Sequence, residues 1–214
     1  MTIARDVWVV GATGLVGREA VLALLEGGAF ARVLTVVRRP SGLTHPRLDE
    51  RVIDFETLSS ALGGEHADVA ICCLGSTIKQ AGSQEQFRHI DYDYALNFAR
   101  AAQAAGARHF LVVTALGAKA DSRVFYNRVK GELERDLAGL GLPALTIVRP
   151  SLLIGERSES RLGEKLAAPL MSFLPKSVRG IEVKKVGRAL AKLAGEPAQG
   201  RRVVPSGELH SLGV

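Results

Sequence analysis

Tyr126 and Lys130 are the residues of this 214-residue chain whose types and spacing most directly suggest chemistry. They stand four positions apart in FYNRVKGELE, which has a helical pattern, so both side chains lie on one helical face. The ammonium favours the phenolate, and such a phenol can exchange a proton with an alkoxide that forms on a substrate. The same spacing also occurs in ordinary surface pairs, so the pair alone does not decide between these interpretations.

Three glycines near the start of the chain form a second pattern. Gly11, Gly14 and Gly17 lie in VVGATGLVG between a short β-branched run and a helical pattern, with the spacing G-x-x-G-x-x-G. Glycines at such a turn let the backbone approach a pyrophosphate, whose charge the free N–H groups of the helix start can bind. Alternatively, the glycines only turn a strand into a helix. The position of the turn after the first predicted strand favours a dinucleotide site.

Arg38 and Arg39 follow the second predicted strand in the segment VVRRP. Folds that bind NAD usually place an Asp or Glu there against the ribose 2′-hydroxyl, whereas an Arg accommodates the 2′-phosphate of NADP. No carboxylate stands beside the two arginines. Alternatively, the two arginines are only solvated charges at the end of the strand. We predict a preference for NADP(H) over NAD(H).

The predicted elements alternate in the order that would bring these residues to one edge of a sheet. Strand and helix patterns follow one another, which indicates a parallel sheet with helices on both faces. The apolar runs VAICCL and FLVV do not alternate, as expected of strands buried on both faces. The fold class is therefore predicted to be α/β, a Rossmann-like doubly wound parallel sheet. Predicted strands cover residues 7–10, 32–37, 52–55, 69–74, 109–114, 144–148 and 203–204; predicted helices cover 84–105, 123–140, 163–173 and 183–194, with one more ending at Gly27-Gly28.

Composition and charge exclude several classes of function. The net charge of +6 is spread along the chain without a basic stripe interleaved with aromatic residues, which argues against nucleic-acid binding. The five histidines are scattered, so no metal site is predicted. Cys72 and Cys73 are adjacent and would point to opposite faces of a strand, so they are expected to be free thiols in a reducing compartment. No signal peptide or membrane span is visible, and we expect a cytoplasmic protein.

Several of these motifs together resemble a known family. GATGLVG, VVRRP, CCLGST, the Tyr126 and Lys130 pair, and Arg149-Pro150 are similar to the extended and atypical short-chain dehydrogenase/reductase superfamily. The segments ICCLGSTIKQAG, HIDYDYALNFARAA, FYNRVKGELE and IVRPSLLIGERSESRLGE resemble its Tat-interacting oxidoreductase-like branch. The resemblance runs from the first strand to about Pro175. It implies a Rossmann-like domain that binds NADP(H).

The resemblance also implies a role for each matching residue. Tyr126 would be the acid/base, and Lys130 would bind the nicotinamide ribose. The other implied cofactor contacts are Gly11, Ala12, Thr13, Gly14, Leu15 and Val16 on the pyrophosphate, Arg38 and Arg39 on the 2′-phosphate, Asp54 and Phe55 near adenine, Gly75, Ser76 and Thr77 under the riboses, and Pro150 and Ser151 near the carboxamide.

The chain departs from the wider superfamily at points that matter for chemistry. Thr114, with Ala115 next to it, stands where a Ser or Thr holds the substrate carbonyl, and Asp91 stands where many extended members have an Asn. We expect one domain over residues 1–214, in which 151–214 form a small C-terminal part on the substrate side with a small or open pocket. Weak candidates for substrate contacts there are Arg157, Glu159 and Arg161.

Two functions remain open from the sequence. The first is NADP(H)-dependent hydride transfer to or from a small carbonyl or alcohol, with Tyr126, Lys130 and Thr114 as catalytic residues. The second is a non-catalytic NADP(H)-binding regulator that a partner protein reads. A homodimer is possible in either case, because the fourth and fifth helices often form dimer faces in the superfamily.

Overall fold

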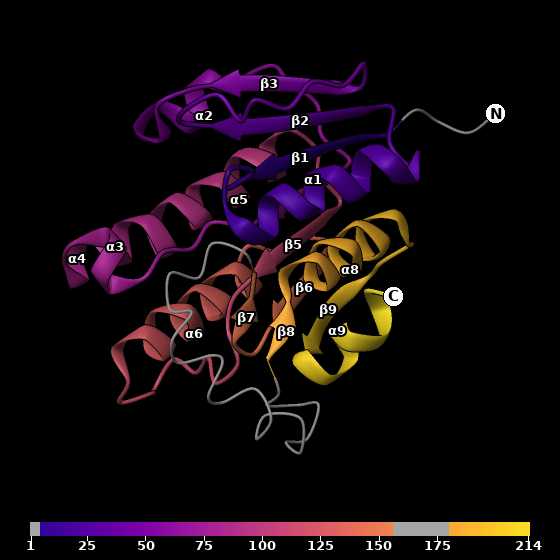
Figure 1. Ribbon diagram of the computed structural model, residues 1–214. Helices are drawn as coiled ribbons and strands as arrows, with labels where there is room; N and C mark the ends of the chain where they lie inside the picture. The colour runs from indigo at the N-terminus through magenta and orange to yellow at the C-terminus, as the bar shows by residue number, and fades with distance from the viewer. Residues whose placement is uncertain (1–4, 156–179) are drawn as a thin grey trace.

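Seven parallel strands form the central sheet of the protein. The computed structural model describes residues 5–155 and 180–214. The strands stand in the order β3-β2-β1-β4-β5-β6-β9, which confirms the predicted Rossmann-like doubly wound sheet (Figure 1). Their bounds are β1 (Asp6–Val10), β2 (Arg32–Val37), β3 (Leu48–Val52), β4 (Val69–Cys72), β5 (His109–Val113), β6 (Ala144–Arg149) and β9 (Gly200–Pro205).

Helices cover both faces of this sheet, as parallel strands with crossover connections require (Figure 1). One face is covered by α1 (Leu15–Gly27), α8 (Val183–Gly195) and α9 (Ser206–Leu212). The other is covered by α2 (Leu58–Ala61), α5 (Tyr94–Ala104) and α6 (Phe125–Ala138). Two short helices, α3 (Ile78–Ala81) and α4 (Gln84–Arg88), follow β4, and the strands β7 (Leu153–Ile154) and β8 (Ile181–Glu182) pair with each other beside the main sheet.

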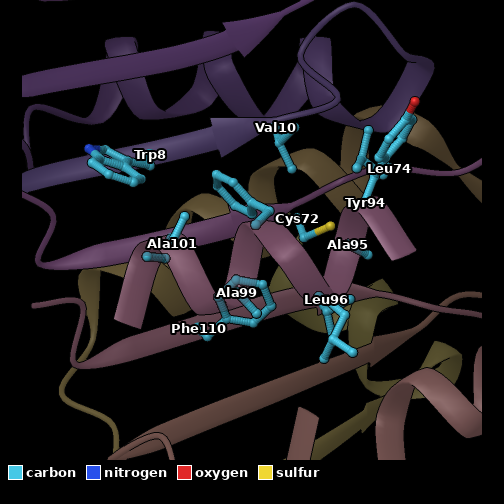
Figure 2. Close-up of a cluster of buried hydrophobic side chains, with 14 of the residues drawn as sticks. Trp8, Val10, Cys72, Leu74, Tyr94, Ala95, Leu96, Ala99, Ala101 and Phe110 are labelled. Carbon is cyan, nitrogen blue, oxygen red and sulfur yellow. The ribbon is translucent and has the colours of Figure 1, made fainter. Parts of the chain in front are cut away.

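The core on the α5 side is built from strand side chains that meet small residues on the helix. Trp8 of β1, Cys72 of β4 and Phe110 of β5 belong to one buried cluster with Ala95 and Ala99 of α5 (Figure 2). The alanines let the helix lie close to the sheet. Burial of each large apolar side chain contributes about 1.5–3 kcal/mol to folding, so this face holds the strands firmly in register.

The two cysteines divide between the two faces, as predicted from strand geometry. Cys72 belongs to the core under α5, and Cys73 packs against the core under α1. Both are free thiols. Burial raises the pKa of Cys72 to about 11 and raises the pKa of Cys73 further, so neither thiol is poised to react as a thiolate.

The predicted strand at 52–55 is wrong. The third strand is Leu48–Val52, and Phe55 begins a 3-10 turn that the Asp54 side chain caps by accepting a hydrogen bond from the Glu56 N–H. Strand β3 lies at the edge of the sheet and carries charged residues, two of which, Asp49 and Arg51, pair with each other. The sequence pattern did not predict β3, because an edge strand can be polar and does not need the apolar run that marks buried strands.

The predicted helix over 84–105 is interrupted. It consists of α4, a π-helical turn at His89–Asp93 and α5. A π turn inserts an extra residue and rotates the side chains that follow it, and such turns are frequent at functional sites. The segments on either side both have helical patterns, so the sequence predicted one continuous helix.

Strand β9, near the C-terminus, belongs to the main sheet. Strand β9 pairs with β6 along its whole length, and α8 packs against α1 so closely that a Cβ at Gly187 would stand 2.5 Å from the Cβ of Glu19. The helix predicted at 163–173 lies outside the described residues. None of the helices in residues 5–155 and 180–214 is long and apolar enough to cross a bilayer.

His109, at the start of β5, makes the fold sensitive to acid. It is 5% exposed, its Nε2 lies 2.8 Å from the Thr146 hydroxyl, and burial, with a smaller effect of Arg5, lowers its pKa to about 4. The unfolded chain therefore binds this proton more tightly than the folded chain. Stability from this source is intact above about pH 6.5 and is lost as the pH falls to about 4.

Urea unfolding of wild type and His109→Asn between pH 7.5 and 4 tests this. We expect the difference in unfolding free energy between the two to change by about 3 kcal/mol over that range in favour of the variant. His66→Asn, at a largely exposed histidine, is the control and should follow wild type. A constant difference between wild type and His109→Asn would show that His109 does not titrate with folding.

Candidate functional site

The carboxyl ends of four neighbouring strands form the candidate site. Strand β1 connects through α1 to β2 on one side, whereas its other neighbour is β4, so the chain reverses direction across the sheet at this point. Crevices at such a switch point are the usual ligand sites of open α/β sheets. The loops after β1, β4, β5 and β6 carry most of the residues that the sequence singled out.

Two of the three glycines are required by close contacts inside the fold. Gly11 has a φ of 80°, and a Cβ there would stand 2.6 Å from the backbone carbonyl of Cys73. A Cβ at Gly17 would stand 2.1 Å from the Gly11 oxygen. Gly11 therefore lets the first turn lie against the loop after β4, and Gly17 lets α1 lie against the first turn, so both glycines have a structural reason in addition to any ligand.

Gly14 differs from the other two, and it presents bare backbone outward. It begins α1 with a φ of −77°, has no side-chain cap, and is exposed together with Thr13 and Leu15. The Arg18 N–H donates to the Gly14 oxygen at 3.0 Å, which is the first hydrogen bond within the helix. The N–H groups of the first turn therefore have no acceptor within the helix. An uncapped, glycine-lined helix start with no acidic residue in its first turn fits a pyrophosphate.

The two arginines after β2 are exposed. Arg38 lies over the ring of Phe55 at 5.8 Å from its centroid, and neither Arg38 nor Arg39 forms an ion pair with another described residue. Phe55 is buried, whereas Asp54 is exposed and caps the 3-10 turn. Both guanidiniums are thus free to pair with an anion beside the first turn.

A polar cluster that the sequence did not reveal lies next to Phe55. Glu56 accepts hydrogen bonds from the Tyr94 hydroxyl at 2.6 Å and from His89 Nε2 at 2.8 Å, and these bonds lower the pKa of Glu56. The bond to Glu56, and a weaker one to Asp93, raise the pKa of His89. Burial and the Glu56 carboxylate raise the pKa of Tyr94 to about 12, so its phenol stays protonated.

Lys130 forms a buried ion pair with Asp91. The ammonium lies 2.7 Å from Asp91 Oδ1, and the two side chains are 2% and 0% exposed. Burial acts to lower the pKa of Lys130, but the charges of Asp91 and Tyr126 outweigh it and raise that pKa. The other carboxylate oxygen of Asp91 accepts hydrogen bonds from the Ser76 N–H at 2.9 Å and from its hydroxyl at 2.6 Å.

This arrangement joins three segments that are far apart in sequence. Asp91 lies in the π turn, Ser76 in the loop after β4, and Lys130 on α6. Gly75 leaves room above the pair, since a Cβ there would still be 3.8 Å from Asp91 Oδ1 and 3.9 Å from Lys130 Nζ. The sequence identified Asp91 only as a departure from the family pattern, not as the partner of Lys130.

Tyr126 lies one helical turn before Lys130 on α6, as predicted from the spacing. It is half-buried, and its ring packs on the buried Phe87 of α4 with centroids 5.4 Å apart. Both residues belong to α6, and their spacing of four places them on the same face of that helix. An acid/base role for the pair stays a prediction.

Thr114 is engaged elsewhere. It is 4% exposed, and its hydroxyl donates to Glu134 Oε1 at 2.6 Å. Arg149 at the end of β6 also binds Glu134, with its Nε 3.0 Å from the same oxygen. This geometry gives Thr114 a structural partner in place of a free hydroxyl for a substrate. Glu134 stands four residues after Lys130, so helical spacing was the signal that could have found it.

The remaining predicted contacts lie along the same edge. Thr77 caps α3 in a reciprocal arrangement with Gln80. Pro150 accepts a hydrogen bond from the Leu116 N–H at 2.8 Å, and Ser151 is buried and accepts one from the Ser206 hydroxyl at 2.8 Å. Arg157, Glu159 and Arg161 lie outside the described residues. Among the described residues, no group of three His, Cys, Asp or Glu could hold a metal ion.

The chain matches a family model described as NAD(P)H-binding over residues 11–197. Among curated proteins, it is 34% identical to Protein HTATIP2 of Rattus norvegicus, over 81% of this chain and 73% of that protein. It is 33% identical to Protein FMP52, mitochondrial, of Eremothecium gossypii, over 95% of both chains.

The names of these relatives contradict the cytosolic location that we predicted. FMP52 proteins of several fungi, 33–36% identical to this chain, are named mitochondrial. The prediction depended on the two free thiols and on the lack of a visible signal peptide or membrane span. Free thiols argue against an oxidising compartment, but they do not distinguish one reducing compartment from another.

Solved structures show the same fold. An oxidoreductase of the short-chain dehydrogenase/reductase family from Burkholderia thailandensis superposes with a TM-score of 0.75 at 19% identity, covering 98% of this chain and 94% of that one. MoeE5 in complex with UDP-glucose and NAD superposes with a TM-score of 0.70 at 20% identity, covering 97% and 80%. With the family match over most of its length, the chain belongs to the NAD(P)H-binding family and has the Rossmann-like fold of short-chain dehydrogenases/reductases.

Proposed function

We propose that the protein is an NADP(H)-dependent oxidoreductase that transfers a hydride to or from a small carbonyl or alcohol substrate. The observation that carries this proposal is the placement of Tyr126 beside the buried, charged Lys130 on one face of α6, at the sheet edge where the glycine loop also lies. When bound, the nicotinamide supplies or accepts the hydride. The residues of the chain bind, orient and move the proton.

Each residue has a distinct part in the proposal. Tyr126 gives a proton to the substrate oxygen during reduction and takes it back during oxidation. Lys130 binds the nicotinamide ribose, and its charge favours the phenolate that forms when Tyr126 loses its proton. Asp91 and Ser76 hold the Lys130 ammonium in place. The open start of α1 binds the pyrophosphate.

Arg38 and Arg39 are proposed to select NADP(H) over NAD(H). A charge-assisted bond to a phosphate is worth about 1.5–3 kcal/mol, so removing both arginines should raise the Kd for NADPH by about 100-fold or more. Calorimetric titration of Arg38→Ala/Arg39→Ala with NADPH and NADH measures this, and the Kd for NADH should hardly change.

Arg100→Ala, at another exposed arginine on α5, is the control for a general loss of positive charge. It should bind NADPH like wild type. If wild type binds NADH as tightly as NADPH, the role given to the two arginines is wrong.

The second candidate is an NADP(H)-binding regulator without turnover. The observation in its favour is Thr114, whose hydroxyl is bound to Glu134 and so does not offer the third group that holds a carbonyl oxygen. In that case the cofactor binds, but a screen of carbonyl and alcohol substrates gives no change in NADPH absorbance. A turnover that Tyr126→Phe abolishes would exclude the regulator as the sole function.

A further inference from the structure

Exposed aliphatic side chains gather along the carboxyl edge of the sheet. In residues 5–155 and 180–214, nine large hydrophobic side chains are exposed, and six of them follow β1, β4, β5 or β6. One of the six, Leu15, belongs to the glycine loop. We call the other five the aliphatic rim: Ile78, Leu116, Val124, Leu152 and Ile154.

The aliphatic rim is built into the segments that flank Tyr126. Val124 is 58% exposed and comes immediately before α6, two residues before Tyr126. Leu116 is tied to the loop after β6, because its N–H donates to the Pro150 oxygen at 2.8 Å. Leu152 is 63% exposed although its own carbonyl accepts a bond from the Ile181 N–H. Backbone hydrogen bonds thus fix two rim residues while their side chains remain exposed.

Four hydroxyl groups in the loops after β4, β5 and β6 form hydrogen bonds within the protein. Ser76 donates to Asp91, Thr114 donates to Glu134, and Ser151 accepts from Ser206. Thr77 accepts from the Gln80 N–H. Recognition of a sugar needs several free donors and acceptors, whereas an apolar chain needs only surface that it can cover.

We propose that the substrate is an apolar carbonyl compound or alcohol whose hydrocarbon chain lies on the aliphatic rim. This inference rests on the proposed function, which places the reacting carbon beside Tyr126. In the reducing direction the carbonyl carbon gains a hydride from the reduced nicotinamide and its oxygen gains a proton from Tyr126, so C=O becomes CH–OH. We expect sugar nucleotides, such as the UDP-glucose in the MoeE5 complex, to bind poorly at such an edge.

A series of linear aldehydes from propanal to decanal tests the proposal by turnover, with glyceraldehyde as the polar control. Burial of one methylene is worth about 0.8 kcal/mol, so kcat/KM at saturating NADPH should rise about two- to fourfold per added methylene. The matching linear alcohols, titrated by calorimetry into the protein with NADPH, should bind with the same dependence, and this needs no turnover.

Two valine-to-serine variants test whether the hydrocarbon chain lies on the aliphatic rim. Val124→Ser should flatten the dependence on chain length for both alcohols and aldehydes. Val52→Ser is the control, because Val52 is 53% exposed but lies at the end of β3, four strands from β5 and thus roughly 19 Å away. It should keep the wild-type dependence.

The outcomes separate this inference from the proposed function. Alcohol affinity that does not rise with chain length overturns the inference, even if glyceraldehyde is reduced and Tyr126→Phe stops the reaction. Alcohol affinity that rises with chain length and falls in Val124→Ser supports it, even if no aldehyde is reduced, and in that case the proposed hydride transfer fails alone.

Discussion

Tyr126→Phe should lower kcat by about 10²–10⁴-fold, the usual contribution of a positioned general acid, while the Kd for NADPH stays close to that of wild type. The reason is that the variant removes only the proton of the phenol. The ring still packs on Phe87, and the Lys130–Asp91 pair is untouched. Turnover is followed by NADPH absorbance with a linear aldehyde, and cofactor binding by calorimetry.

Tyr92→Phe is the matched control for Tyr126→Phe. Tyr92 is also half-buried, but its hydroxyl donates to Asp136 and does not bind Lys130, Asp91 or Ser76. Its kcat should equal that of wild type. If Tyr126→Phe retains full turnover, the phenol is not the acid/base and the catalytic proposal fails.

Replacement of Asp91 should have the largest effect on stability among the site residues. Asp91→Ala leaves the Lys130 ammonium buried without its partner and removes the acceptor of two Ser76 hydrogen bonds. Breaking one side of a buried ion pair costs about 3–5 kcal/mol. Urea unfolding measures this, and Asp121→Ala, which breaks the largely exposed pair with Lys119, should unfold nearly like wild type.

Asp91→Asn separates the positioning of Lys130 from stability. The amide keeps an acceptor for Ser76 but has no charge, so burial should lower the pKa of Lys130 relative to wild type. The alkaline limb of the kcat/KM profile should therefore move to lower pH. An unchanged profile, in a variant that folds, would show that Asp91 does not support the charge of Lys130.

The sheet could be predicted because its central strands are buried on both faces. Strands β1, β2, β4, β5 and β6 have apolar sequences, and each was found within about two residues of its observed bounds. The edge strand β3 was misplaced because its stability comes from pairing with β2 and from charge pairs such as that between Arg32 and Asp49. Such pairs join residues that are not close in sequence, and periodicity does not contain them.

The sequence predicted the motifs of the site but not the contacts between residues of different segments. Helical spacing places Tyr126 and Lys130 on one face, and the glycine pattern marks the first turn. The partners of these residues come from other segments: Asp91 reaches Lys130 through a π turn, and Glu134 binds Thr114 across the gap between α6 and β5. These contacts depend on how the layers pack, so a prediction from types and spacing assigned Thr114 a free hydroxyl that the structure gives to Glu134.

Calorimetric titration of the protein with NADPH and NADP⁺ at low salt is the decisive test of the proposed cofactor site. We expect both redox forms to bind wild type and a marked loss of affinity in Gly14→Ala. A Cβ at Gly14 would stand 3.2 Å from the Gly11 oxygen, so the turn must shift by a few tenths of an ångström, and the Cβ would occupy the space that the pyrophosphate needs. Absence of any binding heat with either form would contradict the proposed NADP(H) site, and equal affinity of wild type and Gly14→Ala would show that the glycine turn does not bind the cofactor.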